Sequence, residues 1–449
     1  MIRKAVIAFF VFLAGLVMIA TLAGFPPAYI VSAPGVATGI GSKLLCSARY
    51  VSGFSREQAF DDLVQYSPIL DQLSIEYDED RKSVTTSLFG LSKKTASYRQ
   101  GLGCSVEYSG YGQAVEVPFQ PSVSSPQEWP AGNIVGEPDT VLTQLLADMV
   151  AKDNQAGLNT RALLVVRNGR ILAEAYDQES DAFTPLLGWS MAKSMVSTML
   201  ANLEYRGLLN IDEPPGFSTW ENDPRAEITV TDMLTMSDGL GFSEEYNPGD
   251  DATAMLFTSA SASDYVLGKE LQQQPGTVFN YSSGTANLLA RLHTDILGGP
   301  QAAYDDYWEN IHQALSFQNA VFETDASGVM VGSSYLYASA RDWARLGQLM
   351  LNRGVINGSR VFRDDWIERA TAANSSGNEK AYGFQWWLNK GDDNLRWPDL
   401  PEGSYMANGN RQQMLMVIPS ANVLIVRLGW TAGSYPLNKL FGEILREVL

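Results

Sequence analysis

A serine and a lysine three residues apart are the first candidates for chemistry in this sequence. Ser190 and Lys193 lie in the stretch 188–196, where the apolar residues after Met191 recur at helical spacing. Side chains three positions apart share one face of a helix, so Lys193 is expected to lie over Ser190. An alcohol needs a base to become a nucleophile, and a lysine serves as that base when burial lowers its pKa. The spacing therefore predicts a nucleophile and its base, although serines at helix N-termini are more often caps.

Two later segments supply further candidates. Tyr281 lies in a polar run, 279–284, and is expected to project from a loop into a cleft. A tyrosine beside a cationic lysine has its phenolate favoured and passes protons, which is the behaviour expected here. Gly409, just before a strand, lets another backbone or a substrate approach closely. A backbone N–H there and that of Ser190 would form an oxyanion hole, although each segment alone also fits an ordinary turn.

Together these segments resemble the serine β-lactamase and penicillin-binding protein superfamily. The likeness is closest to class C-like esterases and 6-aminohexanoate-dimer hydrolases, and it rests on the order Ser-x-x-Lys, Tyr-Ser-Ser and a glycine-marked strand near the C-terminus. The stretches 228–240, 333–342 and 382–387 add to it. The resemblance covers roughly residues 140–449.

The resemblance implies a role for each candidate. Ser190 would be the acylated nucleophile and Lys193 its base. Tyr281 would relay the proton to the leaving group. Gly409 matches the glycine of the family's third motif, and the N–H of Asn410 would join that of Ser190 around the oxyanion.

Departures from the antibiotic-hydrolysing members narrow the expected substrate. Ser283 stands where they usually carry asparagine, and 407–409 reads Ala-Asn-Gly instead of Lys-Thr-Gly. The missing lysine and threonine help to hold the carboxylate of a β-lactam, so lactamase and transpeptidase activity are doubtful. We expect hydrolysis of a small ester or amide, such as a peptide-like or ω-amino-acid oligomer. Trp189, Tyr335 and Trp386, with Ser283, are the expected pocket residues, although core packing is the alternative for at least one tryptophan.

Two hairpins flank a helical middle and predict the fold that positions these residues. Residues 163–174 enclose Asn168-Gly169, the strongest two-residue turn signal, and 412–427 form the second hairpin. Residues 207–342 are mostly helix and loop, and 437–449 form an amphipathic helix. The fold class is therefore α+β, with a mainly antiparallel sheet covered by terminal helices plus an all-helical region.

The chain begins with a basic head and an uncharged apolar run. Arg3 and Lys4 precede residues 5–25, whose length is close to the roughly 20 residues that span a bilayer. The basic head would stay cytoplasmic. The run is either a retained single-span membrane anchor, which its length favours, or a signal segment cleaved after export. Both interpretations place the folded part beyond the inner membrane, in the periplasm.

Composition divides the rest of the chain into four expected segments. These are a Pro/Gly-rich tether (26–45), a small α+β domain (46–108), a Pro-rich linker (109–139) and the hydrolase domain (140–449). Two cysteines in an exported chain favour one disulfide over two unpaired thiols. A bond between Cys46 and Cys104 would tie the ends of the small domain together.

Charge and composition exclude several classes of function. The 449 residues carry a net charge of −18, which argues against nucleic-acid binding and against docking on anionic lipid. With His293 and His312 as the only histidines, a zinc site is improbable, and no metal or organic cofactor is expected. An α/β-hydrolase would need a histidine late in the chain, and none follows His312. A catalytically inactive, membrane-anchored binding or sensor module of the same fold stays open as the alternative. The oligomeric state is not predicted.

Overall fold

The computed structural model describes residues 26–112, 115–117, 126–391 and 393–449. The predicted anchor or signal segment, residues 1–25, lies outside the described residues. Within the part of the chain that is described, no helix combines the length and the apolar character needed to cross a bilayer.

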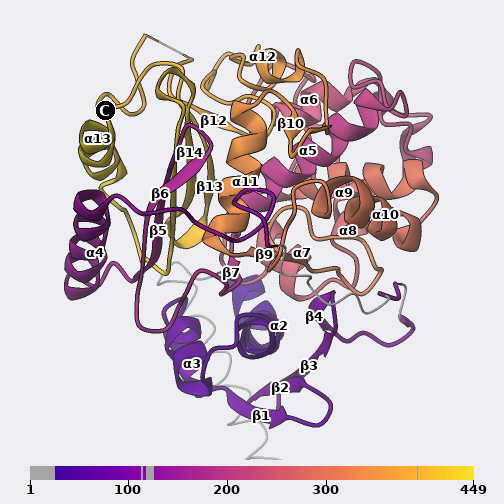
Figure 1. Ribbon diagram of the computed structural model, residues 1–449. Helices are drawn as coiled ribbons and strands as arrows, with labels where there is room; N and C mark the ends of the chain where they lie inside the picture. The colour runs from indigo at the N-terminus through magenta and orange to yellow at the C-terminus, as the bar shows by residue number, and fades with distance from the viewer. Residues whose placement is uncertain (1–25, 113–114, 118–125, 392) are drawn as a thin grey trace, which may run out of the picture.

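A six-stranded antiparallel sheet forms the centre of the larger part of the molecule, as predicted (Figure 1). Its strands, in spatial order, are β12 (Trp387–Leu388), β13 (Tyr405–Gly409), β14 (Gln413–Ile418), β15 (Val423–Gly429), β5 (Thr160–Arg167) and β6 (Arg170–Tyr176). The two predicted hairpins are the pairs β5–β6 and β14–β15, and they meet because β15 pairs with β5. This pairing brings the two ends of residues 140–449, the expected hydrolase region, into one sheet.

Helices cover both faces of this sheet. The helices nearest the two ends of the hydrolase region, α4 (Thr140–Gln155) and α13 (Leu437–Val448), bury their apolar residues on one face. Helix α11 (Ala340–Leu351) packs on the other face, and α5 (Met191–Tyr205) packs against β13 and β14. The side chains of each strand point alternately to the two faces of the sheet. Both faces are apolar here, so both need such a cover.

A helical region extends beyond α5, away from the sheet (Figure 1). Its helices are α6 (Val230–Leu234), α7 (Asp251–Phe257), α8 (Ala262–Leu267), α9 (Ser283–Leu297), α10 (Pro300–Tyr307) and α12 (Trp366–Ala370). Two small sheets accompany it: β7 (Leu186–Leu187), β9 (Leu336–Ala338) and β8 (Val321–Phe322) form one, and β10 (Val355–Ile356) and β11 (Ser359–Arg360) form the other. The predicted α+β class with an all-helical region is confirmed.

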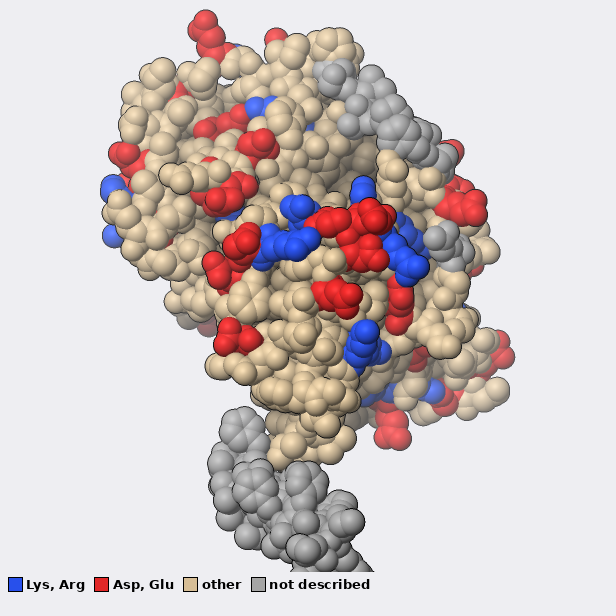
Figure 2. Space-filling view, turned by 90° about the horizontal axis from the view of Figure 1, so that it is seen from below, with Lys and Arg blue, Asp and Glu red and all other residues tan. Residues whose placement is uncertain are grey.

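The N-terminal part is a helix pair on a small sheet. Its elements are α2 (Pro27–Tyr50), α3 (Arg56–Val64), β1 (Ser74–Asp78), β2 (Ser83–Leu88), β3 (Ser92–Arg99) and β4 (Gly103–Val106), with the strands antiparallel in chain order. The predicted disulfide is present and joins Cys46 of α2 to Cys104 of β4. Seen from below, Lys and Arg side chains lie among Asp and Glu side chains on this side of the molecule (Figure 2).

The expectation of a tether over residues 26–45 is wrong, because these residues form most of helix α2. Pro27 occupies the first turn, where a helix tolerates proline. Gly39 allows close packing, since a Cβ at this position would overlap the carbonyl oxygen of Phe257 in α7. The Thr38 hydroxyl donates to the carbonyl of Pro34 at 2.8 Å. Tertiary burial therefore stabilises a helix whose composition is typical of a linker.

A buried ion pair fixes α2 to the hydrolase region. Lys43 pairs with Glu323, which follows β8, and neither side chain is more than 3% exposed. Ser47 Oγ and the backbone N–H of Cys104 also donate to this carboxylate, at 2.8 and 2.6 Å. Since a buried carboxylate needs such partners, Glu323 ties helix α2, strand β4 and the hydrolase region to one point.

Candidate active site

A tight turn between β7 and α5 delivers Ser190. The Gly188 N–H donates to the carbonyl of Leu336 at 2.9 Å, which anchors the turn to β9. Trp189 then adopts a left-handed backbone with φ of 47°, a conformation that is strained for a bulky residue. Ser190 occupies the N-cap position of α5, but its side chain makes no capping hydrogen bond. The hydroxyl is therefore available for another role, unlike that of an ordinary helix cap.

Lys193 lies one helical turn below Ser190 and is 1% exposed. Its Nζ donates to Ser190 Oγ at 2.9 Å, to Ser283 Oγ at 3.1 Å and to the Ser333 carbonyl at 3.1 Å. Burial lowers the pKa of Lys193 to about 8, and the carboxylate of Glu244 opposes this shift. At pH 7 an amine with that pKa is neutral about one tenth of the time, roughly 300 times more than an ordinary lysine. The structure thus gives Lys193 the two properties of a base, reach and a usable neutral fraction.

Glu244 continues the hydrogen-bond network behind Lys193. The Ser283 hydroxyl donates to Glu244 Oε1 at 2.6 Å, and the Ser283 N–H donates to Oε2 at 2.7 Å. The Tyr246 hydroxyl also donates to Oε1, at 2.8 Å. Ser283 therefore lies between the amine of Lys193 and a carboxylate, and it couples their charges.

Tyr281 reaches the same centre from the loop before α9. Its ring stacks on Trp387, with centroids 5.3 Å apart, and Lys193 Nζ lies 4.8 Å from the ring centroid. Burial raises the pKa of Tyr281 and the charge of Glu244 raises it further, while the Ser190 hydroxyl acts in the opposite direction. The expectation that Lys193 would favour the phenolate is wrong, because burial of the ring and the charge of Glu244 both favour the neutral phenol. The hydroxyl of Tyr281 is thus protonated at neutral pH.

Gly409 brings the end of β13 against the turn that carries Ser190. A Cβ on Gly409 would overlap the carbonyl oxygen of Gly188 and lie 3.1 Å from the backbone nitrogen of Ser190. The chain then turns sharply, since Arg411 and Gln412 both have left-handed backbones, with φ of 59° and 65°. Only a glycine permits this approach, and it places Asn410 beside Ser190.

A cavity of about 570 Å³ opens next to Ser190. Trp189 and Asn410 line it beside Ser190, together with part of the loop 246–248. Residues from the N-terminal part line it as well: Tyr29, Ile30, Ala33, Val36, Ala37, Ile40, Tyr66, Ser67, Ile69 and Leu70. The volume is in the range of ligand pockets, which is about 300–1,000 Å³.

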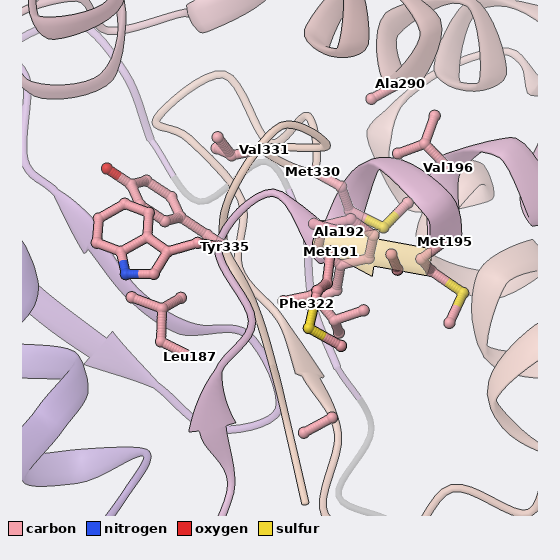
Figure 3. Packing of buried hydrophobic residues seen from close by; sticks show 14 of the residues in the cluster. Leu187, Met191, Ala192, Met195, Val196, Ala290, Phe322, Met330, Val331 and Tyr335 are labelled. Atoms are coloured by element: carbon pink, nitrogen blue, oxygen red, sulfur yellow. The ribbon is translucent and has the colours of Figure 1, made fainter. Parts of the chain in front are cut away.

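Two of the expected pocket residues lie elsewhere. Trp386 is fully buried and packs edge-on against Tyr405, 5.4 Å between centroids. Tyr335 is 2% exposed, its ring centroid lies 6.1 Å from that of Trp189, and it belongs to the buried cluster shown in Figure 3. Neither borders the cavity, because both rings are taken up by core packing. Trp189 does line the cavity, whereas Ser283 lies behind Lys193.

A sequence profile of the beta-lactamase family matches residues 142–437. The chain belongs to the beta-lactamase family. It is 26% identical over 289 residues to the 6-aminohexanoate-dimer hydrolase of Paenarthrobacter ureafaciens, which covers 60% of this chain and 72% of that protein.

Solved structures of the family share the fold. A candidate 6-aminohexanoate-dimer hydrolase from Bacillus anthracis has a TM-score of 0.56 at 21% identity, over 66% of this chain and 80% of that one. A family VIII carboxylesterase has a TM-score of 0.54 at 13% identity, over 70% of this chain and 100% of that one. Together, the family membership and these relatives support a serine hydrolase.

Two further contributors to the site, Glu244 and the apolar stripe of helix α2, were not predicted from the sequence. Glu244 is one carboxylate in a loop, and no spacing in the sequence distinguishes it from its neighbour Glu245. The stripe on α2 did leave a signal, because Ala33, Val36, Ala37 and Ile40 recur at helical spacing. The prolines and glycines between them pointed instead to a tether.

Proposed function

We propose that this protein hydrolyses small esters or amides through an acyl-enzyme formed on Ser190. The observation that carries the proposal is the buried Lys193 amine, which lies 2.9 Å from Ser190 Oγ and has a pKa of about 8. A buried cation without a carboxylate partner in direct contact is unfavourable, so its presence beside a serine hydroxyl calls for a chemical reason.

Acylation begins with the neutral form of Lys193. Its Nζ takes the proton from Ser190 Oγ as this oxygen bonds to the carbonyl carbon of the substrate. The carbonyl oxygen becomes an oxyanion and accepts hydrogen bonds from the backbone N–H groups of Ser190 and Asn410. The N-terminus of α5 adds its positive dipole end at the same place.

Collapse of this intermediate breaks the bond to the leaving group. The leaving oxygen or nitrogen takes a proton from the Tyr281 hydroxyl, which burial keeps protonated, and Tyr281 regains one from the Lys193 ammonium. Water then attacks the acyl-enzyme while the neutral Lys193 amine takes a proton from it and passes this proton to Ser190 Oγ. The acid leaves and Ser190 recovers its proton, so each cycle consumes one water.

The departures at the second and third motifs support an ester or linear amide as the substrate. Ser283 uses its hydroxyl to bridge Lys193 and Glu244, and it therefore has no donor left for a substrate amide. At 407–409 the side chains are alanine and asparagine, neither of which pairs with a carboxylate as a lysine does. The relatives named as a dimer hydrolase and a carboxylesterase fit this class, and peptide-like or ω-amino-acid amides are its amide candidates.

We also propose that the protein works in the periplasm, held by its N-terminal segment or released from it. The disulfide between Cys46 and Cys104 supports an oxidising compartment, and the basic head before an apolar run supports export.

Covalent labelling tests the proposal. The full chain is incubated with a fluorophosphonate probe, and the adduct is mapped by mass spectrometry in the wild type, Ser190→Ala and Lys193→Ala. Ser197→Ala is the matched control, because this buried serine lies on the same helix and its hydroxyl has no partner among the described residues. We expect an adduct on Ser190 that is absent in Ser190→Ala, strongly reduced in Lys193→Ala and unchanged in Ser197→Ala. A folded wild type without an adduct would favour the inactive binding or sensor module.

A further inference from the structure

The cavity beside Ser190 is built for an apolar group. No described residue that lines it is a lysine, arginine, aspartate or glutamate. The guanidinium of Arg411, next in the chain to Asn410, lies 4.0 Å from the ring centroid of Tyr66 and is not among the lining groups. Burial of an unpaired charge is strongly unfavourable, so this surface suits an uncharged group.

One face of α2 is directed toward this cavity. Ala33, Val36, Ala37 and Ile40 follow the spacing of a single helical stripe, and all four line it. An apolar stripe normally packs on other apolar side chains of the protein. Here it borders the space beside the nucleophile, so its natural partner is the substrate.

Helix α2 is a fixed wall of the cavity. The Tyr29 hydroxyl donates to Asp250 Oδ1 at 3.0 Å near the start of the helix. Gly39 packs on the Phe257 carbonyl in its middle, and the buried ion pair of Lys43 holds its second half. Because this wall is already ordered before the substrate binds, little binding energy is lost in ordering it, and this favours selective binding of an acyl chain that fits.

The cavity lies on the acyl side of the reaction. Asn410, whose N–H is assigned to the oxyanion, lines it together with Ser190. Tyr281, the donor to the leaving group, does not line it and lies instead in the cluster with Trp387. A carbonyl held between Ser190 and Asn410 therefore directs its acyl chain into the cavity and its leaving group toward Tyr281.

We propose that the N-terminal part forms the acyl-binding subsite and selects substrates with an uncharged hydrocarbon acyl chain. Ile30 and Ile69, 38% and 37% exposed, form the open end of this subsite, so a longer chain reaches solvent there. The inference rests on the proposed function and narrows it: α2 reads the acyl group, and the hydrolase region performs the chemistry.

Chain-length kinetics test the subsite. We would measure kcat/KM of the full chain, without detergent, for 4-nitrophenyl acetate, butyrate and octanoate. Each methylene that enters the cavity is expected to raise kcat/KM about fourfold in the wild type. Ala37→Phe fills the cavity and should lower the octanoate-to-acetate ratio at least tenfold, with Ala33→Phe as a second variant. Ala28→Phe adds the same bulk at an exposed position of α2 outside the cavity and should leave the ratio unchanged.

Two further arms separate the subsite from the chemistry. Hexyl acetate carries its chain on the leaving group, so Ala37→Phe should not alter its kcat/KM relative to ethyl acetate. If the chain-length effect appears there instead, the assignment to the acyl side is overturned. Calorimetry of methyl octanoate with Ser190→Ala measures binding without turnover. Suppose that the wild type hydrolyses none of the esters, but that Ser190→Ala binds methyl octanoate and loses this binding when Ala37→Phe is added. The subsite would then be retained and the hydrolase function rejected. If the wild type hydrolyses 4-nitrophenyl acetate but shows neither a chain-length effect nor binding of methyl octanoate, the hydrolase function would be retained and the subsite rejected.

Discussion

Glu244→Gln should make the enzyme a better catalyst at neutral pH. The carboxylate of Glu244 raises the pKa of Lys193 against the effect of burial, and the proposed mechanism requires the neutral amine to activate Ser190. Glutamine keeps the size and one acceptor oxygen for the Ser283 hydroxyl, while it removes the charge. The pKa of Lys193 should therefore fall below about 8, and the rising limb of the pH–rate profile should move to lower pH.

The structure sets the size of this shift. Ser283 Oγ lies 3.1 Å from Lys193 Nζ and 2.6 Å from Glu244 Oε1, so amine and carboxylate are less than 6 Å apart. A unit charge at that distance acts with about 3 kcal/mol at an effective dielectric constant of 20, and with about 0.7 kcal/mol in water. These values correspond to about 2 and about 0.5 pKa units. For a half-buried carboxylate we expect about 1 unit, which raises the neutral fraction at pH 7 from about one tenth to about one half.

The assay is kcat/KM for a 4-nitrophenyl ester across about pH 6 to 9, where the profile reports the free enzyme. Glu245→Gln removes the same charge from the exposed neighbouring residue and is the matched control. We expect an apparent pKa near 7 in Glu244→Gln, near 8 in the wild type and the control, and about a fivefold gain at pH 7. A rising limb that stays in place or moves to higher pH would refute the assignment of this limb to Lys193.

Three further variants probe the framework of the site. Gly409→Ala should lower kcat about 100-fold at nearly constant KM in steady-state kinetics, because its Cβ overlaps the Gly188 carbonyl and displaces the oxyanion hole. Lys43→Met should lower the free energy of unfolding in urea by about 3 kcal/mol, since the charge of Glu323 is left buried without its counter-ion, and adding Glu323→Gln should restore most of it. Lys193→Met should abolish turnover yet raise the free energy of unfolding at pH 7 by up to about 3 kcal/mol. Because the unfolded chain binds that proton more strongly, wild-type stability should rise from about pH 8 to 10.5, and a variant that keeps this rise would contradict the pKa shift.

The sequence predicted those features that depend on local spacing. Ser190 and Lys193 share a helix face because three residues make nearly one turn, and this holds in any environment. The hairpin around Asn168-Gly169 follows from turn geometry in the same way. The disulfide could be predicted because the chain has only two cysteines, which allow a single pairing.

Electrostatic state was not predictable, because it depends on what surrounds a group after folding. The spacing of Ser190 and Lys193 does not predict whether the lysine is buried, and burial is what lowers the pKa of its amine. Tyr281 was placed at the site by its motif, but the direction of its pKa shift was predicted wrongly, since burial of the ring favours the neutral phenol. Glu244 joins the hydrogen-bond network of the site only because the loop before α7 folds over the start of α9.

The sequence by itself thus predicted the candidate nucleophile and its candidate base, the sheet that positions them and the family to which the chain belongs. The tertiary structure alone decided the charge states in the site and the wall opposite Ser190. Helix α2 shows the physical reason most directly. Its glycines and prolines disfavour a helix locally, and only the close approach of Gly39 to α7 and the buried pair of Lys43 with Glu323 make the helix the stable state.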